Sequence, residues 1–277
     1  MTSAARVSSL LLALTVLLVS LSPALARECG DDVAGARVPC SCGDVVTSDT
    51  RLRPDDPVVR QVCPYEGLIV AASPLADSIT LDLNGLALRG ERYGAGIRVE
   101  SGGASGAVIR GAGSGRGYGE VVGFSIGIAT PRHGAVARIE GVEVKGARGN
   151  GLSLRGRGVV LIDVTSSFNG GDGVRLSGAG GRLARVQAVG NGGNGLSLFA
   201  AGVVVDGAAV SNRKHGIVVR AGRATLEAVQ ARYNGGVGIL APQHLFGQGS
   251  AAGTESIVSG SNGRRDVRYT GRKEAVP

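Results

Sequence analysis

The segment Asn150-Gly151-Leu152-Ser153-Leu154 decides the fold, because it recurs along the second half of the chain. Its copies lie at 172–176 (DGVRL), 194–198 (NGLSL), 215–219 (HGIVV) and 237–240 (VGIL). The glycines of these copies follow one another at steps of 22, 22, 21 and 22 residues. Self-similarity at a fixed period of this length indicates a solenoid, in which each repeat is one structural unit stacked on the next.

Four asparagines run in phase with these glycines and close successive units just before a Gly-rich turn. They are Asn169, Asn191, Asn212 and Asn234. Asparagine tolerates the left-handed backbone region of tight turns, and its side-chain amide can form a ladder with equivalent amides along a stack. The spacing therefore predicts a structural turn residue in these coils.

Within each unit the apolar residues alternate, as Leu152 and Leu154 do, which is typical of a strand with one buried face. Neither this strand nor the apolar run that follows at 159–164 can bury its face alone, whereas stacking at roughly 4.8 Å pairs every strand with its copies above and below. The period is too long for hexapeptide or nonapeptide helices. We therefore predict an all-β fold, a right-handed parallel β-helix with coils of about 22 residues.

Composition agrees with this prediction. The chain has 48 glycines and 9 prolines, 43% hydrophobic residues and 3% aromatic residues. The aliphatic content is too high for a disordered chain, and the glycines lack the strict period of collagen. Glycine at this density indicates many regularly placed turns.

The first 26 residues predict a cleaved signal peptide. Arg6 is their only charge, the apolar run 10–21 follows, and small residues precede a cleavage site after Ala26. We therefore expect a secreted or periplasmic protein that is not an integral membrane protein. After cleavage we expect three parts: an N-terminal cap at 27–65, a β-helix at 66–262, and a C-terminal cap with a basic tail at 263–277.

All four cysteines lie in the expected cap: Cys29, Cys40, Cys42 and Cys63. An even number of cysteines in an exported protein predicts disulfides, and four cysteines allow three pairings that the sequence does not distinguish. A zinc site is the alternative, but Cys40-Ser41-Cys42 lacks the usual two-residue spacer. We expect a disulfide-bonded cap and no metal.

The segments 42–46 (CGDVV) and 79–85 (ITLDLNG), together with the repeats, resemble the right-handed parallel β-helix proteins of the pectate-lyase-like superfold. The resemblance is closest to small exported bacterial members and covers residues 66–240. It implies the fold and leaves the function open, since this superfold includes polysaccharide lyases, hydrolases, epimerases, phage tailspikes and adhesins.

The sequence shows no catalytic cluster of the kind that the resemblance would imply. The Asp-Pro-His-Asp motif of alginate epimerases and the Arg-x-Pro-x-x-Arg motif of pectate lyases are absent, and Arg175 stands where a nonapeptide calcium motif needs aspartate. His215, beside Lys214, is the weak candidate for a general base, although its position before a glycine makes a turn residue the simpler interpretation. We expect no cofactor.

The outward positions of the first strand in each coil instead carry basic residues: Arg98, Arg155, Arg175 and Arg220. Lysine and arginine number 30 against 22 acidic residues, and loss of Arg6 with the signal peptide lowers the net charge from +8 to +7. Arginine's planar fork suits carboxylates and phosphates, so these four residues are a candidate binding stripe. The alternative is that they only solubilise an outer face.

These observations predict an exported, non-catalytic protein that binds or scaffolds an anionic polysaccharide or cell-envelope polymer. Nucleic acid is not an expected partner, because an exported protein rarely meets it. The alternative function is a polysaccharide lyase or epimerase acting on acidic glycans.

Overall fold

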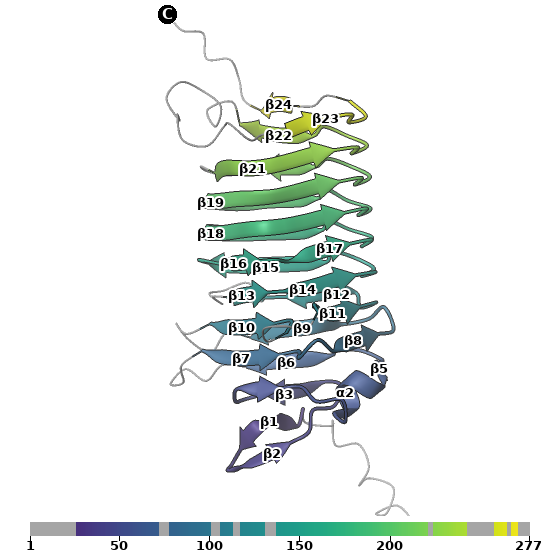
Figure 1. Cartoon of the computed structure of the whole chain (residues 1–277), viewed down its shortest axis with the longest axis vertical. Helices are drawn as coiled ribbons and strands as arrows, with labels where there is room; N and C mark the ends of the chain where they lie inside the picture. Colours follow the sequence, from purple (N-terminus) through teal and green to yellow (C-terminus); the bar gives the residue numbers. More distant parts are fainter. Residues whose placement is uncertain are drawn as a thin grey trace, which may run out of the picture.

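The computed structural model describes residues 26–71, 78–100, 106–112, 117–130, 137–220, 224–242, 258–264 and 267–270. The expected signal peptide, apart from Ala26, lies outside these residues, as do His133 and His244. The described strands stack along one long axis, with the N-terminal hairpin at one end and β24 (Val267–Thr270) at the other (Figure 1). The predicted parallel solenoid is confirmed.

Most coils contribute three strands, which form three faces. The first face contains β1 (Glu28–Val33), β3 (Asp44–Val46), β6 (Leu68–Ala71), β9 (Ala95–Glu100), β12 (Ile126–Ala129), β15 (Leu152–Arg157), β20 (Ile217–Val219), β22 (Ile239–Pro242) and β24. The second contains β4 (Thr50–Arg51), β7 (Ile79–Asp82), β10 (Ala107–Arg110), β13 (Ala137–Glu140) and β16 (Val160–Ile162). The third contains β5 (Val62–Cys63), β8 (Ala87–Gly90), β11 (Gly119–Val122), β14 (Val142–Lys145), β17 (Thr165–Ser167) and β23 (Val258–Gly260).

Three strands in the later coils are long. β18 (Val174–Val189) and β19 (Leu196–Val210) pass through all three faces, and β21 (Ala224–Arg232) covers the second and third. All pairings between coils are parallel, so each residue lies above its counterpart in the preceding coil. Outward side chains of successive coils therefore form columns along the axis.

The 22-residue period holds only in the second half of the chain. There, equivalent first-face residues are 22, 22, 21 and 22 residues apart: Leu152, Val174, Leu196, Ile217 and Ile239. Earlier coils are longer, since Leu68 pairs with Ile97 and Ile97 with Ile128. The extra residues fall mainly between the first and second faces, where β6 ends at residue 71 and β7 begins at residue 79.

Aliphatic side chains fill the interior. The alternating residues Leu152, Leu154, Val174 and Leu176 are all 0% exposed, as the alternation predicts. Fully burying one such side chain stabilises a protein by about 1.5–3 kcal/mol relative to leaving it in water. The outer coils need a cover because an open end would expose this interior.

The asparagines of the sequence pattern form a buried ladder beside this core. The backbone N–H and the side-chain Nδ2 of Asn191 both donate to Oδ1 of Asn212, at 3.0 and 2.9 Å, and Nδ2 also donates to the carbonyl oxygen of Ser166. The same arrangement links Asn169 to Asn191, and Asn212 to Asn234. A fifth rung, Asn262, accepts from Asn234 at 3.0 Å. The ladder satisfies buried turn groups that would otherwise lack hydrogen bonds.

The N-terminal cap closes the first coil. Disulfides join Cys29 to Cys40 and Cys42 to Cys63, which selects one of the three pairings left open by the sequence and confirms a disulfide-bonded cap. β1 turns into β2 (Ala36–Val38) as an antiparallel hairpin, and the short helix α2 (Pro57–Arg60) follows.

A buried ion pair stabilises the same cap. Asp56 is 1% exposed, and both of its carboxylate oxygens accept from Nη2 of Arg37, at 2.8 and 2.9 Å. The backbone N–H groups of Cys40 and Arg53 also donate to this carboxylate. These contacts compensate the charge that the cap buries.

We expect the change Asn191→Ala to destabilise the protein by about 3 kcal/mol, because it leaves several buried donors and acceptors of the adjoining rungs unpaired. Urea denaturation followed by circular dichroism measures the loss. The change Ser211→Gly, at the exposed position beside the ladder, is the matched control and should have little effect. Equal stability of the two variants would show that the ladder does not stabilise the stack.

We also expect the double change Cys42→Ser with Cys63→Ser to lower the free energy of unfolding by about 3 kcal/mol, because the disulfide closes a loop of 21 residues in the unfolded chain. Thermal denaturation with and without a reductant provides the measurement. In the variant, the remaining effect of the reductant should reflect Cys29–Cys40 alone. An unchanged midpoint in the oxidised variant would contradict a stabilising role.

Candidate functional site

The predicted arginine stripe occupies two neighbouring columns of the first face rather than one. Arg98 and Arg175 belong to the column that continues through Ser197 and Val218. Arg155 belongs to the next column, which continues through Ser177 and Phe199 to Arg220. The four residues share a face but lie in different coils.

A groove of about 440 Å³ opens on this face at the edge where turns lead in from the third face. It extends over the four coils that begin at Asn150, Asp172, Asn194 and Lys214, and Ser197 lies within it. Its remaining lining comprises Gly170, Gly171, Arg175, Gly192, Gly193, Phe199 and Arg220.

The groove exists because two successive turns have glycine pairs where neighbouring turns have side chains. The pairs 170–171 and 192–193 lie between Arg148, in the coil below, and Arg213-Lys214, in the coil above. A Cβ at Gly170 would collide with the carbonyl oxygen of Arg148, so the close stacking of these turns also requires glycine there. The glycine pairs were visible in the sequence, but their meaning depends on which residues stack against them.

Two guanidinium groups share the ring of Phe199 within the groove. The Cζ atom of Arg175 lies 4.6 Å from the ring centroid, and that of Arg220 lies 5.7 Å from it. Cation–π contacts of this kind hold a guanidinium in place without using its N–H donors. Both arginines can therefore present donors to a ligand that lies against Phe199.

The groove is positively charged overall. Lys214 adds a third cation, and Asp172 is the carboxylate among its lining residues. Asp172 Oδ2 lies 4.0 Å from Nη1 of Arg175, and its Oδ1 accepts the backbone N–H of Asn194. One carboxylate thus faces three cations, which favours an anionic ligand.

The other two predicted stripe residues lie outside the groove lining. Arg155 is exposed on the same face, two coils below Phe199 in its column. Arg98 is further away along the axis and its charge is countered by two carboxylates, Glu66 at 3.9 Å and Glu100 at 3.3 Å. The structure therefore brings together Arg175 and Arg220, with Arg155 nearby, and separates Arg98 from them.

His215 occupies a second, outer ladder on the turns. In this ladder the side chains of Asn150, Asp172 and Asn194 each accept the backbone N–H of the next coil, at 2.8 to 3.1 Å. His215 continues the series, since its Nδ1 accepts the N–H of Val237 at 2.8 Å. Its Nδ1 is thus engaged in the turn, and a role in proton abstraction stays a prediction that would involve Nε2.

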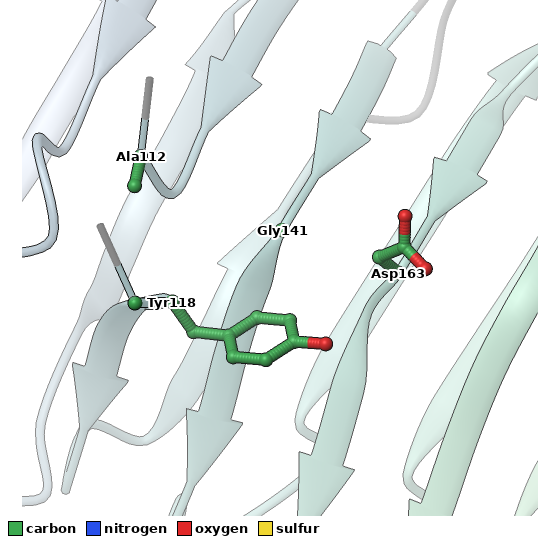
Figure 2. A pocket seen from close by; sticks show the side chains of 5 residues that line it. Ala112, Tyr118, Gly141 and Asp163 are labelled. Carbon is green, nitrogen blue, oxygen red and sulfur yellow. The ribbon is translucent and has the colours of Figure 1, made fainter. Parts of the chain in front are cut away.

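A second, smaller pocket of about 230 Å³ lies on the opposite side of the coil, around Asp163. Figure 2 shows the ring of Tyr118 reaching over Gly141 toward this carboxylate. Arg185, in the next coil, donates to both oxygens of Asp163 at 2.6 and 2.7 Å. This hydrogen-bonded guanidinium lowers the pKa of Asp163, so the group is ionised at neutral pH and is a poor general acid.

Metal-binding clusters and membrane-spanning helices are both absent from the described residues. These residues contain no group of three or more His, Cys, Asp or Glu side chains arranged to hold a metal ion. Among the same residues, no helix has the length and apolar character needed to cross a membrane.

Part of the chain matches a known family model. Residues 126–260 match the family model described as a right handed beta helix region. Searches of curated proteins and of solved structures gave no match. The matched residues include the whole groove.

The Asp163–Arg185 pair predicts a pH-dependent contribution to stability. Because the pKa of Asp163 is lowered in the folded state, the contribution is present at neutral pH and is lost as the pH falls below about 4. We expect Asp163→Asn to lower the melting temperature slightly at pH 7 and to have a smaller effect at pH 2.5. Asparagine tolerates the left-handed backbone at this position, where φ is 52°, so the backbone is not newly strained. An equal decrease at both pH values would assign the effect to something other than the ion pair.

Proposed function

Because the chain contains a right-handed β-helix region, we propose that it is an extracytoplasmic, non-catalytic protein whose first face binds an anionic polysaccharide or cell-envelope polymer. The observation that carries this proposal is the pair Arg175 and Arg220 placed on the ring of Phe199, in a groove with Lys214. The fold alone would not favour this function over others.

The groove arginines keep most of their charge available to a ligand, whereas some arginines elsewhere on the surface are neutralised. Arg37, Arg51, Arg98, Arg138 and Arg185 each lie within 4.0 Å of at least one carboxylate. Arg220 takes part in no ion pair among the described residues, and Arg175 has one contact at the 4.0 Å limit. Other exposed arginines such as Arg182 are also unpaired there, so the ring of Phe199 is what distinguishes the two groove arginines. Unneutralised cations held beside a recessed surface are more useful for recognition than for solubility alone.

The shape of the site suits an extended ligand. The groove is open, and its lining comes from four successive coils, which at about 4.8 Å per coil span about 14 Å along the axis. Arg155 extends the cationic surface beyond it on the same face. A linear polymer with repeated carboxylates or phosphates that follows the axis would contact Arg155, Arg175 and Arg220 in that order.

The disulfide-bonded cap supports an extracytoplasmic location for the protein. Two disulfides point to an oxidising, extracytoplasmic compartment. We propose that residues 1–26 are removed as a signal peptide, that 27–65 act as the cap of a β-helix at 66–262, and that the mature protein is secreted or periplasmic.

We expect Arg175→Ala and Arg220→Ala each to weaken binding to an anionic polysaccharide about tenfold, since each removes charge-assisted hydrogen bonds. Isothermal titration against polygalacturonate, alginate and teichoic acid, repeated at several salt concentrations, measures this loss. Arg182→Ala is the matched control, because Arg182 is exposed on the same strand, β18, but faces outward from the second face.

Three outcomes are informative for this proposal. Salt-sensitive binding that falls in the two groove variants and not in the control supports it. Equal loss in all three variants would mean that net charge alone attracts the polymer. Ultraviolet absorbance from unsaturated products during incubation would overturn the non-catalytic assignment and establish a lyase.

A further inference from the structure

Exposed aromatic side chains gather on one edge of the solenoid. Of the five exposed aromatic residues in the described part of the chain, four lie on turns that lead from the third face to the first. They are Tyr65, Tyr93, Phe168 and Tyr233, and we call this row the aromatic edge. It lies at the right of Figure 1, where turns follow the arrowheads of β17, β18 and β21.

Three rings of the aromatic edge, Tyr93, Phe168 and Tyr233, are equally spaced along the axis, and Tyr65 lies beside Tyr93. Tyr65 and Tyr93 lie on adjacent turns, with ring centroids 6.1 Å apart. Each turn hydrogen-bonds to the next through backbone N–H groups, and three such steps separate Tyr93 from Phe168 and Phe168 from Tyr233. At about 4.8 Å per step, these intervals are each about 14 Å, and the whole edge is about 34 Å long. The two equal intervals from Tyr93 to Tyr233 suit a ligand that itself repeats.

Two of these aromatic residues have an unfavourable backbone conformation. The φ angle is 54° at Phe168 and 57° at Tyr233, in the left-handed region that bulky residues rarely adopt. Glycine occupies the same turn position in neighbouring coils, at Gly146 and Gly190. The rings are 71% and 62% exposed, so burial does not repay this strain. Exposed Ser211 has the same backbone conformation at this turn position, so the strain belongs to the turn, and the exposure of the two large rings is what points to a role in recognition.

The surface between the rings favours a sugar polymer over a protein. Between Phe168 and Tyr233 the turns present Gly190, Gly192 and Gly193, followed by the exposed cations Arg213 and Lys214. A protein interface needs a contiguous apolar core, whereas Phe168 and Tyr233 are separated from each other and from the Tyr65–Tyr93 pair by several coils. Pyranose rings have apolar C–H faces that stack on aromatic rings, and they need only separated platforms.

We propose that the aromatic edge is a second binding track, on which the ring faces of a polysaccharide stack along the solenoid axis. This proposal rests on the proposed function in one respect, which is that the ligand is a polysaccharide. The groove recognises charge, while the edge recognises ring faces and does not require a charged sugar. Gly170 and Gly171 of the groove lining are separated from Phe168 by Asn169 alone, so the two surfaces adjoin.

Fully methyl-esterified polygalacturonate is the probe that separates the two surfaces, because its carboxylates are neutralised and its pyranose rings are kept. Affinity electrophoresis or titration in 0.5 M NaCl, which screens charge contacts, should show binding by the intact protein. We expect Phe168→Gly and Tyr233→Gly each to weaken this binding about fivefold. Arg175→Ala and Arg220→Ala should leave it unchanged while weakening binding to polygalacturonate at low salt.

Ser211→Gly is the matched control, since Ser211 has φ 57° at the same turn position and carries no ring. It makes the same backbone change as the two aromatic variants and should retain full binding. We expect all three glycine variants to have similar melting temperatures. If Phe168→Gly alone melts lower and binding persists, the ring has a packing role and the proposal fails.

Two other results would also overturn the proposal. If the intact protein does not bind the esterified probe, the aromatic edge is not a binding track and the groove is the remaining candidate site. A sedimentation velocity change from oligomer to monomer in Phe168→Gly or Tyr233→Gly would show that a second copy of the chain covers the edge. Failure of the groove variants to weaken low-salt binding would instead count against the proposed function and not against the track.

Discussion

Hydrogen bonding between successive coils is the interaction on which the rest of the structure depends. Backbone groups of every coil pair in parallel with the coils above and below, and the asparagine ladder extends this pairing into the buried turns. A buried amide left without a partner is costly, so each turn must reproduce the geometry of its neighbours. Regular turns in register then arrange the outward side chains in columns, which produces both the groove and the aromatic edge.

Much of the fold could be predicted from the sequence. The glycine period and the alternation at Leu152 and Leu154 determine strand, turn and stacking, because these depend on local geometry repeated many times. The earlier coils were harder to predict, since additional residues between faces break the period. Additional residues also explain why Asn262 was not predicted as a rung, since it follows Asn234 after 28 residues instead of 21 or 22. Its local sequence, Ser261-Asn262-Gly263, nevertheless has the pattern of the other rungs.

The candidate site was only partly predictable. Arg155, Arg175 and Arg220 were found by alternation, which identifies the face but not the column. The placement of Arg175 and Arg220 on Phe199 depends on register between coils, and the neutralisation of Arg98 depends on Glu66, 32 residues earlier. Disulfide pairing likewise required the three-dimensional path of the cap. Contacts between distant residues were the part that a single sequence did not determine.

Stacking in register also means that distances along the axis change only in whole steps. A substitution replaces one group in a column but moves none of the others, whereas duplication or loss of a coil shifts every group beyond it by about 4.8 Å. The 21-residue coil containing Asp206 shows that the stack absorbs a one-residue deletion within a bend and restores register at Gly207. The number of coils therefore sets the length of the binding surface, while the outward side chains set its chemistry, and each can change without the other.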